Sequence, residues 1–188
     1  ATLFIIENHE KLQINPTKLI TSGSSAGAIT ALQAEYAIAN RTSLAAVLPE
    51  GFDYAGVMSF AGAIFSVDGK PKGKNKPAPI IMFHGNSDQQ VPYDKATMMG
   101  IGFYGPKYLS EELAKENSPY WFYDMEYQGH NIAGAPMFTN HNEIKTFIQD
   151  FAIKRRPLMI HTVIKDGELP ESKTKFKLKD YIEANFGK

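Results

Sequence analysis

The chain contains no cysteine in its 188 residues. This absence excludes disulfide bonds, thiolate metal sites and a cysteine nucleophile. An excess of charge of either sign is also missing, because Lys and Arg together number 20 and Asp and Glu together number 20, so that the formal net charge is zero. Since nucleic-acid binding calls for a clear positive excess, we expect no nucleic-acid partner.

Long apolar runs are absent as well. A helix needs roughly 20 consecutive apolar residues to cross a bilayer, and the longest runs here are far shorter, so no membrane span is expected. Residues 1–5 lack the basic and the long apolar segment of a secretory signal peptide. The hydrophobic content of 43% is ordinary for a folded globular protein, and the length favours one domain.

Short apolar runs alternate with helical patterns along the chain. Strands are predicted at residues 18–22, 54–60, 80–83 and 120–127, and helices at residues 1–12, 26–39, 107–117 and 142–153. Strands that alternate with helices are typical of an α/β protein. The predicted fold is therefore a mostly parallel sheet flanked by helices.

A break at Arg155-Arg156-Pro157 divides the sequence into a domain of residues 1–153 and a carboxyl-terminal extension of residues 154–188. The extension contains one apolar run, at 158–164, followed by lysines at alternate positions from 173 to 179. Alternating charge of this kind is typical of a solvated strand edge or helix face.

The segment Gly23-Ser24-Ser25-Ala26-Gly27 lies between a predicted strand and a predicted helix. This is the G-x-S-x-G pattern of a nucleophile elbow, in which small residues allow a sharp turn and the central serine is held in a strained conformation with its Oγ exposed. We expect Ser25 to be a nucleophile and the backbone N–H of Ala26 to face a developing oxyanion. The alternative is a Gly/Ser-rich helix cap.

A serine nucleophile needs a base and a group that orients the base. Asp88 follows the predicted strand 80–83, and His130 follows the predicted strand 120–127, so both are expected at the carboxyl edge of the sheet beside Ser25. Asp88 could instead be a turn or capping residue. If Asp88 is not the orienting acid, Asp124 and Glu126 are the next candidates.

The other histidines have simpler interpretations. His84 is expected to bond within its own loop, His141 to cap the last helix, and His9 and His161 lie in the first helix and in the extension. His130 is therefore the predicted base.

Three motifs in this order resemble those of the α/β-hydrolase superfamily: residues 15–27 with the elbow, residues 81–88 followed by Val91-Pro92, and Gly129-His130. Within it the sequence is similar to small bacterial esterases of the feruloyl/acetyl-xylan esterase and dienelactone-hydrolase type. The resemblance covers roughly residues 1–153. It implies an α/β-hydrolase catalytic domain with Ser25 as nucleophile, His130 as general base and acid, and Asp88 as its orienting partner.

The resemblance also implies the substrate and the setting. The expected substrate is a small-molecule or carbohydrate-linked ester, and no metal or organic cofactor is expected. Esterases that act on polysaccharide side chains are often exported, which favours a secreted or periplasmic location. Two rivals remain: a prolyl-oligopeptidase-like serine peptidase, and a non-catalytic hydrolase-like binding domain.

One departure from the family concerns the residues before the elbow. The family has further strands there and a His-Gly-type loop that supplies a second oxyanion donor, whereas no glycine precedes Gly23 in this sequence. We therefore expect the chain to be the carboxyl-terminal part of such a protein, incomplete at its amino end. The strand at 18–22 would lie in the centre of the complete sheet.

The stretch between Asp88 and His130 is rich in aromatic residues. Phe103 and Tyr104 lie among glycines on a predicted loop, so these two are the candidates for a substrate pocket. The alternative for most of the aromatic residues is packing in the core.

Overall fold

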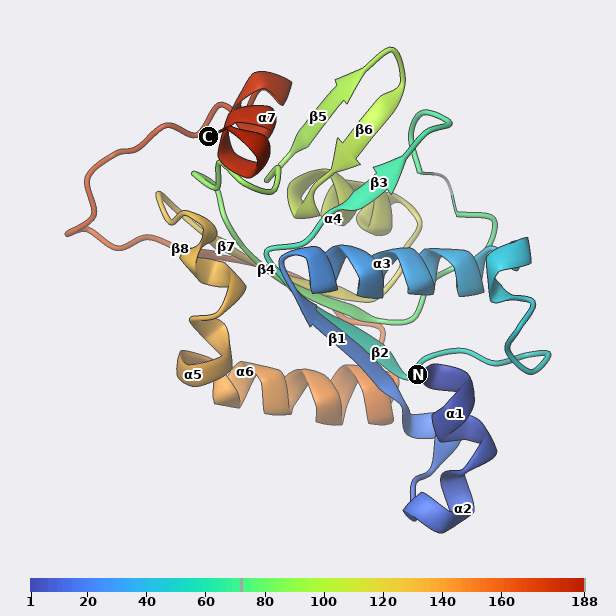
Figure 1. Ribbon diagram of the computed structural model, residues 1–188. Helices are drawn as coiled ribbons and strands as arrows, with labels where there is room; N and C mark the ends of the chain where they lie inside the picture. Colours follow the sequence, from blue (N-terminus) through green and yellow to red (C-terminus); the bar gives the residue numbers. More distant parts are fainter. Residues whose placement is uncertain (72, 188) are drawn as a thin grey trace.

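A computed structural model describes residues 1–71 and 73–187 of the chain. Its centre is a five-stranded sheet in the order β1-β2-β4-β7-β8, in which every neighbouring pair is parallel (Figure 1). The strands are β1 (Ile20–Ser24), β2 (Gly56–Phe60), β4 (Ile80–Gly85), β7 (Tyr120–Met125) and β8 (Met159–Ile164). The prediction of an α/β protein with a mostly parallel sheet is confirmed.

Helices cover both faces of this sheet. Figure 1 shows α3 (Ala26–Ala39) on one face and α6 (His141–Thr146), which continues into a π-helical segment (Phe147–Ile153), on the other. Side chains of a strand alternate between the faces, so in β4 Met82 packs with the α3 side and Phe83 with the α6 side. All six residues of β4 are buried, as expected of a parallel strand covered on both faces.

A second, three-stranded antiparallel sheet lies beside the first, in the order β3-β6-β5. Its strands are β3 (Ile64–Ser66), β5 (Lys95–Met98) and β6 (Ile101–Tyr104), and α4 (Pro106–Lys115) follows it. Phe103 and Tyr104 lie in β6, so the prediction that they lie on a loop was wrong. Of the glycines that indicated a loop, Gly100 lies in the turn between β5 and β6 with φ +85°, a conformation that favours glycine, whereas Gly102 lies within β6.

The extension that begins at residue 154 contributes a strand to the main sheet. Its apolar run forms β8, which pairs with β7 from Met159 opposite Tyr120 to Ile164 opposite Met125. The indole Nε1–H of Trp121 donates to Thr162 Oγ1 at 2.9 Å across this pair. The other end of the sheet is β1, which within residues 1–71 and 73–187 pairs with β2 and with no further strand. Among the described residues, β1 is therefore an edge strand of this sheet.

The remaining elements are short. They are α1 (Thr2–Glu7), α2 (His9–Leu12), α5 (Pro136–Thr139), α7 (Leu178–Phe186) and 3-10 turns at Pro16–Lys18, Ser43–Ala45 and His130–Ala133. The predicted helix at 1–12 is divided at Asn8.

Candidate active site

Ser25 lies at the junction of β1 and α3 in a strained backbone conformation. Its φ is 53° and its ψ is −120°, a region that side-chain-bearing residues seldom adopt. The neighbouring glycine explains how the turn closes, because a Cβ on Gly23 would overlap the backbone of Gly27. At Gly27, by contrast, an added Cβ would meet nothing within 4 Å.

The structure brings Ser25, His130 and Asp88 together in one chain of hydrogen bonds. Ser25 Oγ lies 2.8 Å from His130 Nε2, and His130 Nδ1 lies 2.8 Å from Asp88 Oδ2. A carboxylate can only accept, so the hydrogen of the neutral imidazole is on Nδ1. Nε2 therefore presents its lone pair to the Ser25 hydroxyl, which donates to it.

Asp88 is 1% exposed, and it is anchored by the backbone of its own loop. Its Oδ1 accepts from the N–H of Gln90 at 2.8 Å and of Val91 at 3.0 Å. This leaves Oδ2 for His130. Burial alone would raise the pKa of the carboxyl, but hydrogen bonds from His130, His84 and Val91 together outweigh burial and hold the pKa well below its ordinary value. Asp88 is therefore ionised at neutral pH.

His84 supports this loop from the end of β4. Its buried ring places Nε2 3.1 Å from the Val91 carbonyl and 3.4 Å from Asp88 Oδ2. Because the carbonyl only accepts, Nε2 carries the hydrogen and donates. The prediction that His84 bonds within its own loop is confirmed.

The loops that carry Asp88 and His130 are joined by backbone contacts that the sequence did not indicate. Asn86 Oδ1 accepts from the N–H of Tyr127 at 2.7 Å, and the N–H of Ser87 donates to Gln128 O at 3.0 Å. A Cβ on Gly85 would overlap the Gln128 carbonyl. The only signal for these roles was the presence of glycine and asparagine, which is common to ordinary turns.

The elbow is also tied to the histidine loop. The hydroxyl of Ser24 donates to Ala133 O at 2.6 Å, so its Oγ is already committed to a backbone acceptor. Ala26 and Gly27, at the start of the 14-residue α3, are exposed. The amino-terminal end of α3, with its favourable dipole, is therefore open beside Ser25.

The alternative acid Asp124 has other partners. Its Oδ2 accepts from the Tyr93 hydroxyl at 2.6 Å and lies 3.2 Å from His161 Nε2. The carboxyl that contacts the His130 ring is that of Asp88, not that of Asp124.

The two aromatic candidates do not share one environment. Tyr104 is 3% exposed and packs on the Tyr108 ring in the core, at 4.9 Å between ring centroids. Its prediction as a pocket residue is therefore corrected to core packing. Phe103 is partly exposed and packs between the rings of Phe65 and Tyr181.

Within residues 1–71 and 73–187, no helix has the length and apolar content needed to cross a membrane. The same residues contain no group of three or more His, Asp or Glu placed to hold a metal ion. A scan against protein-family models, a search of curated proteins and a search of solved structures each returned no match.

Proposed function

We propose that this chain is a serine esterase of the α/β-hydrolase type, which hydrolyses a carboxylic ester through an acyl-enzyme. The observation that carries the proposal is the hydrogen-bonded row from Ser25 through His130 to Asp88, with both heavy-atom distances at 2.8 Å. A row of this kind aligns the lone pair of the imidazole with the hydroxyl that must lose its proton.

The order of the three residues along the chain adds support. The serine follows β1, the aspartate follows β4 and the histidine follows β7, all strands of one parallel sheet. Parallel strands end at one edge, so three distant residues meet there. The α/β-hydrolase arrangement has the same order of nucleophile, acid and histidine, with the serine on a strained strand-to-helix turn.

The proposed reaction has two halves. Ser25 Oγ attacks the ester carbonyl carbon while His130 Nε2 takes its proton, and the oxyanion that forms accepts a hydrogen bond from Ala26 N–H. The bond to the leaving alcohol then breaks as His130 returns the proton to the alcohol oxygen. A water molecule then attacks the acyl carbon while His130 takes its proton. His130 passes this proton to Ser25 Oγ as the bond between Oγ and the acyl carbon breaks, which releases the acid. The buried Asp88 carboxylate stabilises the imidazolium in both halves.

The proposed substrate is a small-molecule or carbohydrate-linked ester. A fluorophosphonate probe, followed by mapping of the modified peptide, tests the nucleophile directly. We expect modification at Ser25, none in the Ser25→Ala variant, and unchanged modification in Ser24→Ala. Modification at Ser24, or at no serine, contradicts the proposal.

Hydrolysis of esters and of peptide amides distinguishes an esterase from a serine peptidase and from a hydrolase-like binding domain. We expect hydrolysis of p-nitrophenyl acetate by the wild-type chain and none by Ser25→Ala. Faster cleavage of peptide amides than of esters would indicate a serine peptidase. Labelling without turnover of either substrate would indicate a hydrolase-like binding domain.

A further inference from the structure

The carboxyl-terminal segment that follows β8 returns to the loop that carries Asp88. Figure 1 shows the chain leaving β8 in a wide arc and ending in α7, which lies beside β5. We call residues 172–186 the C-terminal strap. The proposed triad uses none of its residues, yet the strap contacts the loops of two triad members.

Ser172, at the start of the strap, joins these two loops. Its Oγ lies 2.6 Å from Ser87 Oγ and 3.2 Å from the Tyr127 carbonyl oxygen. Ser87 directly precedes Asp88, and Tyr127 lies in the loop that leads to His130. A hydroxyl can donate one hydrogen bond and accept others, so the Ser172 side chain bonds to both loops at once.

Two side-chain amides continue the contact after Asp88. The Nε2–H of Gln89 donates to the Lys173 carbonyl at 3.1 Å. The Nδ2–H of Asn185, near the end of α7, donates to the Gln90 carbonyl at 3.2 Å. The strap therefore bonds to the residue before Asp88 and to the two residues after it.

An aromatic contact anchors α7 on the small antiparallel sheet. The Tyr181 ring packs on the Phe103 ring at 4.9 Å between centroids, and Phe103 packs on Phe65 of the neighbouring β3 at 5.0 Å. The second hydrogen of the Asn185 amide is also placed, because Nδ2 donates to the Tyr181 carbonyl at 3.0 Å. One amide thus connects the anchored residue of α7 to the Asp88 loop.

We propose that Ser172 and Asn185 are positioning residues of the proposed active site, which hold the Asp88 loop so that Asp88 Oδ2 meets His130 Nδ1. They add to the contacts that Asn86 makes with the histidine loop. The catalytic consequence rests on the proposed esterase function. The hold on the loop does not, so each part has its own measurement.

Amide hydrogen exchange of the full chain, followed by NMR, measures the hold on the loop without any substrate. The N–H groups of Gln90 and Val91 donate to Asp88 Oδ1, so they report local opening of this loop. The N–H of Met82 lies in β4, which is paired on both sides, so it reports opening of the sheet. The exchange rate of a protected N–H follows the population of its open state.

We expect Ser172→Ala and Asn185→Ala each to accelerate exchange at Gln90 and Val91 about three- to tenfold, the effect of one lost hydrogen bond of ordinary strength. The rate at Met82 should not change. Ser172→Thr keeps the hydroxyl and should exchange like the wild type.

Tyr181→Ala tests whether the strap acts as a unit. The ring contacts of Tyr181 are with Phe103 and Phe186, so its removal acts on the loop only through α7 and Asn185. We expect faster exchange at Gln90 here too. Glu183→Gln is the control on the same helix, because it removes only an exposed ion pair with Lys179 at 3.3 Å, and it should change no rate.

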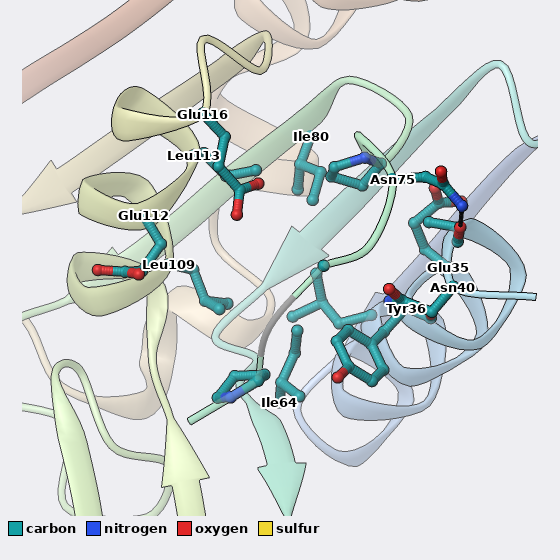
Figure 2. A pocket seen from close by; sticks show the side chains of 15 residues that line it. Glu35, Tyr36, Asn40, Ile64, Asn75, Ile80, Leu109, Glu112, Leu113 and Glu116 are labelled. Carbon is teal, nitrogen blue, oxygen red and sulfur yellow. Dashed lines mark hydrogen bonds between the residues drawn. The ribbon is translucent and has the colours of Figure 1, made fainter. Parts of the chain in front are cut away.

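A variant in the core separates loosening of the loop from loss of global stability. Leu113 lies on α4 beside a pocket whose opposite wall, with Glu35, belongs to α3 (Figure 2). Leu113 is buried in the core, so Leu113→Ala should lower the unfolding temperature. It should accelerate exchange at Met82 and leave the rates at Gln90 and Val91 unchanged.

Kinetics with p-nitrophenyl acetate measure the catalytic consequence. The double variant Ser172→Ala/Asn185→Ala should lower kcat at least about threefold and leave KM unchanged, because the strap aligns the acid and does not bind the substrate. If the wild-type chain hydrolyses no ester, the proposed function fails, and the exchange rates still decide whether the strap holds the loop.

Three outcomes overturn the proposal. The first is unchanged exchange at Gln90 and Val91 in both the double variant and Tyr181→Ala. The second is equal acceleration at Met82, which would mean that these variants only destabilise the fold. The third is an unchanged kcat in a double variant whose loop exchanges faster, which would remove the positioning role.

Discussion

The Asp88 carboxyl and the His130 imidazole are 42 residues apart in the chain and lie 2.8 Å from each other. They meet because the loops that carry them pack backbone against backbone, with Asn86 bridging to Tyr127 and with no space for a side chain at Gly85. The contact is thus built by the loops that follow β4 and β7, which are neighbours in the sheet.

Because the backbone of Ser25 is strained, we expect glycine at this position to stabilise the fold relative to alanine. Ser25→Gly and Ser25→Ala both remove the nucleophile, so neither should hydrolyse esters. Glycine, however, adopts φ 53° without strain, so Ser25→Gly should be more stable than Ser25→Ala by about 1–3 kcal/mol. Denaturant unfolding measures this difference. Equal stability of the two variants would show that the elbow stores no backbone strain.

Asp88→Asn should lower kcat by a factor of about 10⁴ with the fold intact. The amide oxygen would remain with the N–H groups of Gln90 and Val91, so the NH₂ group would face His130 and favour the wrong tautomer. Kinetics with p-nitrophenyl acetate and circular dichroism measure both properties.

The matched control for this change is Asp124→Asn, which removes the charge of an acid bonded to Tyr93 and His161. Its kcat per folded molecule should stay within a few-fold of wild type. A loss below tenfold in Asp88→Asn would assign the orienting role to another acid.

Glu35 predicts a specific pH dependence of stability. Its folded-state pKa of about 7 lies above its ordinary value of 4.5, so between these pH values the folded chain holds a proton that the unfolded chain has released. The free energy of unfolding should therefore fall as pH rises through this window, by about 3 kcal/mol from this group.

Glu35→Gln removes this titration. Unfolding by urea at pH 4.5 and pH 8 should show that the variant gains stability relative to wild type as pH rises. Parallel pH profiles for the two proteins would contradict the raised pKa that burial gives the Glu35 carboxyl. The exposed Glu111→Gln variant controls for the change in net charge.

The two elbow glycines should respond differently to alanine. Gly23→Ala places a methyl group on the backbone of Gly27 and should destabilise the fold by several kcal/mol, since backbone on both sides cannot yield. Gly27→Ala lies in the first turn of α3 with open space around it. It should be neutral or stabilising by up to about 1 kcal/mol, because alanine is the better helix former. Thermal unfolding of both variants decides this, and similar losses in both would refute the assignment of open space at Gly27.

The local sequence pattern determined the positions of the central strands, of α3 and of the three candidate site residues. The predicted helix at 26–39 coincides with α3, and the four predicted strands correspond to β1, β2, β4 and β7. Residues adjacent in the sequence indicate these elements clearly: the strands are apolar runs bounded by Gly and Pro, and the helix is an alanine-rich segment after a Gly/Ser turn. The choice of Ser25, Asp88 and His130 rested on the same local evidence, namely polar residues that directly follow buried strands.

Tertiary structure decided the rest. The sequence alone did not place the run at 158–164 as β8 beside β7, because strand order depends on which apolar faces find partners. Phe103 and Tyr104 read as loop residues because Gly100 and Gly102 interrupt the pattern, yet antiparallel pairing with β3 and β5 makes them a strand. The absence of a hydrogen-bond partner for the buried Glu35 Oε2 among the described residues is also a tertiary property. It depends on which backbone N–H groups reach a buried carboxyl, and contacts 43 residues apart, such as that with Ala78, leave no mark on local sequence pattern.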